Sequence, residues 1–81
     1  MSRPTAFTAA LKGSHTVNVY DAQRGNIYRI VTLPRGSDII SGPIVFSDGF
    51  SVTVKESSGS MYILTYSFPL CNLKTKIHIS Q

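Results

Sequence analysis

The 81-residue chain has little of what usually cross-links a small domain. Cys71 is its one cysteine, so no disulfide can form within the chain, and we expect it to be a small buried residue. Its two histidines, His15 and His78, lack the spacing of metal ligands. A domain of this size buries only about 60% of the surface that its unfolded chain exposes. We therefore expect association with copies of itself to supply the missing stability.

Long hydrophobic runs are missing as well. No apolar run approaches the roughly 20 residues of a membrane-spanning helix, so no membrane partner is predicted. Residues 1–10 lack the charged region and following apolar stretch of a signal peptide. Together with the absence of cysteine pairs, this predicts synthesis and assembly in a reducing cytoplasm.

Motifs for catalysis and cofactor binding are absent. No GxxxxGK or GxGxxG phosphate-binding loop occurs, so no cofactor is predicted. Asp21, Asp38 and Asp48 lie beside turns, where carboxylates accept backbone N–H bonds without forming a catalytic pair. Neither His15 nor His78 is flanked by a nucleophile motif. We predict a protein without enzymatic activity and without a metal site.

Charge is sparse but biased, with eight basic and four acidic residues giving a net charge of +4. A general affinity for anionic partners follows, although the basic residues are scattered. In the expected last strand, Lys74 and Lys76 alternate with Thr75 and Ile77 and project from one face with His78. An alternative function is therefore a small basic β-barrel that binds nucleic acid. Its contact residues would be Arg29, Lys55, Lys74 and Lys76.

Turn signals are what the chain has in abundance. Glycine recurs every 6 to 12 residues between short runs of β-branched and aromatic residues, a pattern typical of an all-β barrel or sandwich. We predict one domain, residues 1–81, built mainly from antiparallel meander. Strands are expected near 6–12, 15–21, 26–33, 43–47, 50–56, 60–68 and 74–79. Residues 35–42 are predicted to form a loop with Ile39 and Ile40 turned inward.

The hairpin over residues 43–56 illustrates how register is predicted. A three-residue loop, 47–49, places Phe46 opposite Phe50 and Ile44 opposite Val52, all on one face. A two-residue loop ending at the same glycine mixes apolar and polar residues on both faces. The three-residue loop is favoured, because its glycine accepts a left-handed conformation.

A loop of the same length at 57–59 aligns Val54 with Tyr62 and Phe50 with Tyr66. The meander then carries one continuous apolar face, which a slip of one residue would scatter. The predicted core residues are Ile44, Phe46, Phe50, Val52, Val54, Tyr62, Leu64 and Tyr66.

The first hairpin is expected to be apolar on both sides. A four-residue loop, 22–25, places Val19 opposite Tyr28 and Val17 opposite Ile30. The reverse face is also apolar, and a chain this small has little to cover it, so we predict that it is a homo-oligomer interface. The candidate interface residues are Tyr20, Ile27, Val31 and Leu33.

Two resemblances bear on these predictions. Residues 17–28, an apolar strand followed by Asp21, polar residues, Gly25 and a second strand, resemble one blade edge of a quinoprotein-type β-propeller repeat. Residues 43–54 look like the next hairpin of such a blade. The chain holds at most about one and a half blades, so this resemblance implies a propeller only if several chains assemble.

At the level of the whole chain, the sequence is similar to short all-β proteins of marine phages. The shared residues are 13–21, Gly25 and 41–43. This similarity implies a virus-encoded protein with a role in the particle or in contact with the host. We therefore expect a structural or interaction protein that works as a homo-oligomer, with other virion or host proteins as further partners.

Overall fold

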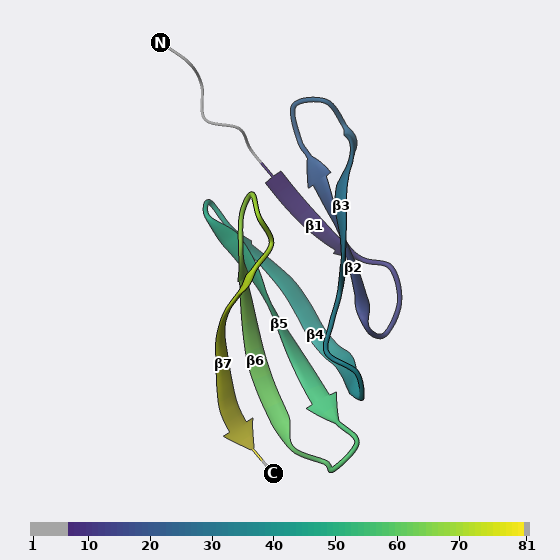
Figure 1. Cartoon of the computed structure of the whole chain (residues 1–81), viewed down its shortest axis with the longest axis vertical. Coiled ribbons are helices and arrows are strands. Elements are labelled where there is room, and N and C mark those ends of the chain that lie inside the picture. Colours follow the sequence, from purple (N-terminus) through teal and green to yellow (C-terminus); the bar gives the residue numbers. More distant parts are fainter. Residues whose placement is uncertain (1–6, 81) are drawn as a thin grey trace.

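The computed structural model describes residues 7–80, and within them the chain is all-β (Figure 1). Seven strands occur and no helix, so none of these residues forms a helix that could span a membrane. Runs rich in valine, isoleucine, threonine and tyrosine make up these strands, as expected for residues that fit a pleated surface. The strands are β1 (Phe7–Leu11), β2 (Thr16–Asp21), β3 (Asn26–Thr32), β4 (Ser37–Phe46), β5 (Gly49–Glu56), β6 (Met61–Ser67) and β7 (Leu73–Ser80).

The strands form two antiparallel sheets. Sheet A has three strands in the order β1-β2-β3, and sheet B has four in the order β4-β5-β6-β7. Each strand pairs with the next one along the chain, so both sheets are meanders, as predicted. The described strands do not join into one closed barrel.

The core lies between the two sheets and takes residues from both. Most of the residues predicted for the core are buried. Four further residues, from the β2–β3 hairpin and the segment directly after it, are buried with them. Full burial of one such side chain stabilises the fold by about 1.5–3 kcal/mol. The buried apolar residues are Val17, Val19, Val31, Leu33, Phe50, Val52, Val54, Leu64 and Tyr66.

The β5–β6 hairpin has the predicted register. Phe50 pairs with Tyr66 and Val54 with Tyr62, around a turn at 57–59. Gly59 has φ +96°, the left-handed conformation for which the glycine was expected. The rings of Phe50 and Tyr66 stack with their centroids 5.3 Å apart, so this register places large apolar surfaces together in the core.

The predicted register of the β4–β5 hairpin is wrong. Phe46 pairs with Gly49 and Ile44 with Ser51, so the turn holds only residues 47 and 48. As a result Ile44 and Phe46 lie outside the core, with 61% and 44% of their surface exposed. The physical reason is Gly49, whose missing side chain lets β5 approach β6: a Cβ atom there would overlap the carbonyl oxygen of Tyr66.

The predicted loop over residues 35–42 is also wrong for most of its length. β4 begins at Ser37 and runs through this segment, with Ile39 half-buried and Ile40 exposed rather than turned inward. The strand pairing shifts twice between Ile39 and Ile44, which lets the strand continue past Gly42 and the proline after it. Such bulges are a common device on edge strands.

The β2–β3 hairpin has the predicted four-residue turn but a different register beyond it. Asp21 pairs with Asn26, and a bulge at Tyr28 then shifts the pairing by one residue. Val17 is therefore opposite Val31, not Ile30. This shift turns Val31 into the core and leaves Ile30 on the other side of the sheet.

Candidate interaction surfaces

The outer face of sheet B, defined as the side away from the core, is free of charge over most of its area. Directly opposed residues of antiparallel strands lie on the same side of a sheet, so the pairing traces rows across it. One row is Ile44–Ser51–Thr65–Thr75, and the next is Ser41–Thr53–Ile63–Ile77. With Phe46 from the end of β4, these residues form the outer B face.

Apolar side chains stand out from this outer B face. Ile44 and Ile77 are 61% and 53% exposed, and Phe46 is similarly open to solvent. The first charged row, Asp38 opposite Lys55, comes only at the end of the sheet where β4 begins. An uncharged face with exposed large apolar residues is the usual signature of a contact surface.

The outer face of sheet A has the same character. Its rows place Tyr20 opposite Ile27 and Asn18 opposite Ile30, with threonine and alanine residues around them. Ile27 and Ile30 are each 49% exposed. The residues of this outer A face are Thr8, Ala10, Thr16, Asn18, Tyr20, Ile27, Ile30 and Thr32.

The structure divides the four residues predicted for an oligomer interface. Tyr20 and Ile27 pair on the outer A face, as an interface requires. Val31 and Leu33 are only 6% and 4% exposed, because the bulge turns their side of β3 into the core, so their assignment to a surface is wrong. Ile30 takes their place on the outer A face; no local signal in the sequence marks the bulge that puts it there.

The residues predicted to contact nucleic acid do not all gather on one side. Lys76 is opposite the buried Leu64 and so faces the core side of sheet B, whereas Lys55 lies on the outer side, opposite Asp38. Lys74 falls at a shift in the β6–β7 pairing, so simple alternation no longer places it beside Lys76. Arg29 belongs to the other sheet.

Lys76 is engaged within the protein. Its Nζ lies 3.1 Å from Oε2 of Glu56 and 4.4 Å from the ring centroid of Tyr62. The ring of His78 packs 5.0 Å from the same tyrosine ring. The ammonium group therefore has a carboxylate partner, and it covers the ring face on which a base would stack.

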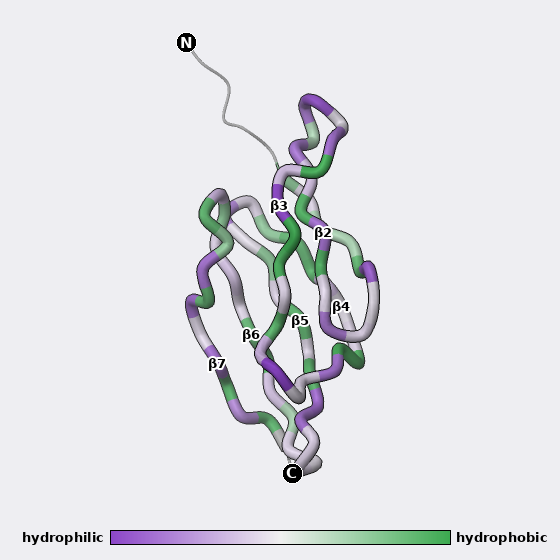
Figure 2. Tube along the Cα trace, turned by 45° about the vertical axis from the view of Figure 1, so that its right-hand side comes forward, coloured by the Kyte–Doolittle hydropathy of each residue, from purple (hydrophilic) through white to green (hydrophobic). Residues whose placement is uncertain are grey.

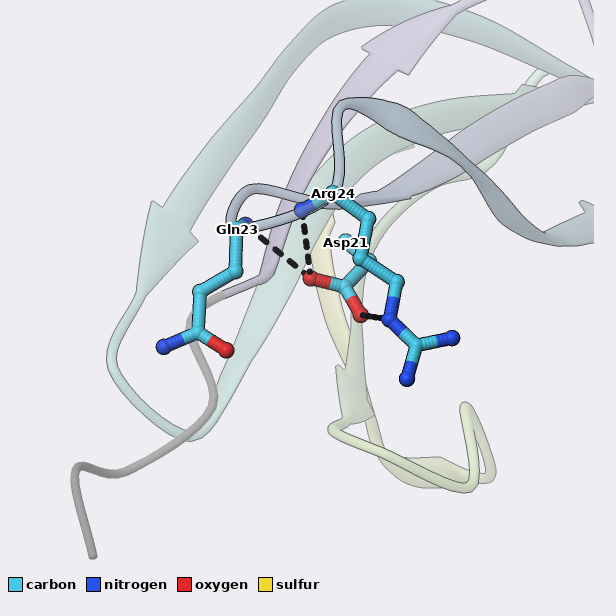
Figure 3. Close-up of polar contacts among 3 residues, drawn as sticks. All are labelled: Asp21, Gln23 and Arg24. Atoms are coloured by element: carbon cyan, nitrogen blue, oxygen red, sulfur yellow. Dashed lines mark hydrogen bonds and ion pairs between the residues drawn. The ribbon is translucent and has the colours of Figure 1, made fainter.

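Asp21, at the β2–β3 turn, accepts backbone hydrogen bonds as predicted (Figure 3). Oδ1 of Asp21 accepts hydrogen bonds from the backbone N–H groups of Gln23, at 3.0 Å, and Arg24, at 3.3 Å. The Arg24 guanidinium lies 4.0 Å from Oδ2 of the same carboxylate. The carboxylate thus closes the β2–β3 turn.

Cys71 and the histidines are not gathered into a site among the described residues. Cys71 lies half-buried in the β6–β7 loop, packed against the core; burial raises the pKa of its thiol, and the positive charge of Arg29 partly opposes this. No group of three His, Cys, Asp or Glu residues in 7–80 could hold a metal ion. A hollow of about 360 Å³ at the β3–β4 loop is lined by His15, Arg35 and Asp38 among others, and Ser14 Oγ lies 3.4 Å from the His15 ring at an exposed turn.

Comparisons of the chain with protein-family models, with curated proteins and with solved structures found no match.

Proposed function

We propose that this chain is a small β-sandwich that works as a self-associating structural or interaction protein. The observation that carries the proposal is the pair of largely uncharged outer faces, each with exposed isoleucines on its edge strands. Removing such side chains from water favours association, at about 25 cal/mol for each Å² of apolar surface buried. The resemblance to marine phage proteins supports a role in a virus particle or at a host contact.

The distribution of charge supports the outer faces as the contact surfaces. Copies of a chain with net charge +4 repel one another, so contacts between them are favoured where charge is absent. A stable interface buries about 800 Å² on each partner. The chain exposes 5235 Å² in total, so an interface of that size would take about 15% of its surface.

Nucleic-acid binding is less well supported. Lys55 and Lys76 lie on opposite sides of sheet B, and the second of them already contacts a carboxylate and an aromatic ring. A phosphate backbone is bound by several cations that face it together.

Light scattering coupled to size-exclusion chromatography tests the proposal. The wild-type chain should show a mass of at least two chains of 8.9 kDa each at micromolar to millimolar concentration. The substitutions Ile44→Lys with Ile77→Lys, on the outer B face, or Ile27→Lys with Ile30→Lys, on the outer A face, should return it to the monomer.

Leu70→Lys is the matched control, because Leu70 is 61% exposed but lies in the β6–β7 loop, away from both faces. It should leave the mass unchanged, and circular dichroism should show that every variant keeps its β-structure. A wild-type chain that stays monomeric at millimolar concentration would contradict the proposal.

A further inference from the structure

The two sheets do not match in width, which leaves one strand of sheet B without a strand opposite it. Sheet A has three strands and sheet B four. The sheets approach most closely where β1 lies near β4 and β5, at one side of the molecule. In Figure 2, β3 passes in front of the middle of sheet B, whereas β7 lies at the left margin with no strand in front of it. Accordingly, all residues from Leu73 to Ile79 are exposed.

The uncovered side of β7 is basic. Lys76 and His78 are opposite Leu64 and Tyr62, which places both on the core side of the sheet. From the other sheet, Arg29 is opposite the buried Val19 and so also faces inward, although it is exposed at the edge. Its positive charge also partly opposes the rise in the pKa of the Cys71 thiol that burial causes, so Arg29 lies within electrostatic range of the β6–β7 loop.

β3 is the edge strand next to this basic side. It pairs only with β2, so the backbone N–H and C=O groups along its other side have no strand partner among the described residues. Beyond its bulge, the pairing with β2 is regular from Arg29 to Thr32. A regular exposed edge is the template on which an extended peptide adds as a further strand.

We propose that β3 binds an extended acidic segment of another protein as the fourth strand of sheet A. That strand would lie over the inner side of β7, about 10 Å away, the usual spacing of packed sheets. Its inward side chains, at alternate positions, would be Asp or Glu and would face Lys76, His78 and Arg29. Its outward side chains would be apolar or threonine and would extend the outer A face beside Ile30 and Thr32.

A second copy of the chain does not fit this position. The added strand needs acidic residues two positions apart, so that both point inward. The chain has four acidic residues, Asp21, Asp38, Asp48 and Glu56, and no two of them are two positions apart. The occupant is therefore a different protein, and this inference does not rest on self-association through the outer faces.

Glu56 shows the chemistry that such a segment would offer. Its side chain is 28% exposed, and its carboxylate already lies at hydrogen-bond distance from the ammonium of Lys76, whose side chain is 42% exposed. The Lys76 ammonium thus binds a carboxylate at a partly exposed position, as an acidic side chain of the added strand would require.

Fluorescence anisotropy with a labelled peptide tests the inference. The probe is an acetylated peptide of alternating valine and glutamate, and the control peptide has the same composition with its glutamates contiguous. The alternating peptide should bind saturably and lose affinity as salt is added. Lys76→Glu should weaken it by roughly tenfold, the scale expected when attraction of an exposed pair becomes repulsion. Lys55→Glu, the same charge change on the outer side of sheet B, should leave affinity unchanged.

Two further measurements make the test specific. Lys76→Glu should gain affinity for a peptide of alternating valine and lysine, which a merely unfolded variant would not do. In nuclear magnetic resonance spectra, the amides of 29–32 should shift on titration with the alternating glutamate peptide, and those of 44–46 should not.

Several outcomes would overturn the inference. They are equal binding of the contiguous-glutamate peptide, no binding at low salt, or shifts confined to β4. Tighter binding of an oligothymidine than of the alternating peptide would overturn it in favour of nucleic acid. None of these outcomes bears on the mass measured by light scattering, so failure here is separable from failure of the proposed self-association.

Discussion

The two lateral sides of this molecule protect their strand edges very differently. On one side β1 lies near β4 and β5, and the backbone N–H of Ile39 donates to the carbonyl of Ser14, which ties the start of β4 to the β1–β2 turn. Pro43, which has no N–H to offer, lies in the same edge strand. On the other side β3 and β7 are exposed along most of their length.

The covered side of the molecule contributes to the stability of the fold, whereas the open side is available for binding. The covered side, with its bulges and proline, gives an incoming strand little to pair with, as natural edge strands usually do. The open side keeps its backbone groups available and carries Arg29, Lys76 and His78. Three further comparisons follow, each between two residues that are chemically alike but differently placed in the fold.

The largest expected effect compares two phenylalanines of one hairpin. Phe50 is fully buried, whereas Phe46 is 44% exposed. Phe50→Ala should lower the free energy of unfolding by about 3–5 kcal/mol, because it leaves a cavity in the core. For a domain of this size that approaches the whole stability. Phe46→Ala should cost less than about 1 kcal/mol in the monomer.

Urea denaturation at low protein concentration measures both changes. Keeping the protein dilute matters, because Phe46 belongs to the outer B face and association would add to its effect. Equal losses for the two alanine variants would mean that the outer B face is not a surface of the monomer.

A smaller effect is expected from two glycines. An added Cβ at Gly49 would overlap the carbonyl oxygen of Tyr66, whereas one at Gly13 would have nothing within 4 Å. Gly49→Ala should therefore destabilise the fold by about 1–3 kcal/mol, the range for overpacking. Gly13→Ala should change stability by no more than about 0.5 kcal/mol, as for most surface substitutions.

Thermal unfolding followed by circular dichroism compares the two alanine variants. Should Gly49→Ala prove as stable as wild type, the close approach of β5 and β6 at this point would be wrong, and with it the explanation of the β4–β5 register.

The smallest effect concerns alkaline pH. Burial raises the pKa of the Tyr66 hydroxyl above its ordinary value, so the unfolded chain loses this proton first as pH rises. The protonated Tyr66 hydroxyl therefore contributes in full to the free energy of unfolding below about pH 10, the ordinary tyrosine pKa. This contribution is lost as pH rises through the higher pKa of the folded state. Tyr66→Phe should lack the part of the alkaline loss of stability that comes from ionisation of Tyr66.

Urea midpoints at pH 9 and pH 11, roughly one unit either side of the ordinary tyrosine pKa, measure the effect. Tyr28→Phe is the matched control, because Tyr28 is 41% exposed on the open side, and it should keep the wild-type pH dependence. An identical pH dependence for Tyr66→Phe and wild type would contradict the prediction.

The hairpins show how far the sequence leads. Alternation over β5 and β6 predicted both register and core correctly, because Gly59 adopts the left-handed turn that such glycines usually mark. The same rule failed at Gly49, which serves a close approach to β6 instead of a left-handed turn. It failed again at Tyr28, where a bulge changes which β3 residues face the core. The first of these errors comes from a contact with β6, a strand outside the β4–β5 pair.

The candidate surfaces divide in the same way. Tyr20 and Ile27 could be found from alternation next to a recognisable turn, and the outer A face does contain them. Ile44 and Phe46 were assigned to the core and lie on the outer B face, because one residue of register exchanges the two faces. The basic open side could not be foreseen, since it depends on one sheet having fewer strands than the other.

Local chemistry alone determined that this chain forms short antiparallel strands joined by tight turns, since side-chain alternation and turn residues act within a few positions. Tertiary contacts decided which side of each strand is buried and which edge is left open. Those outcomes depend on how closely two backbones pack and on how many strands each layer holds, and neither quantity is written in any single segment of the chain.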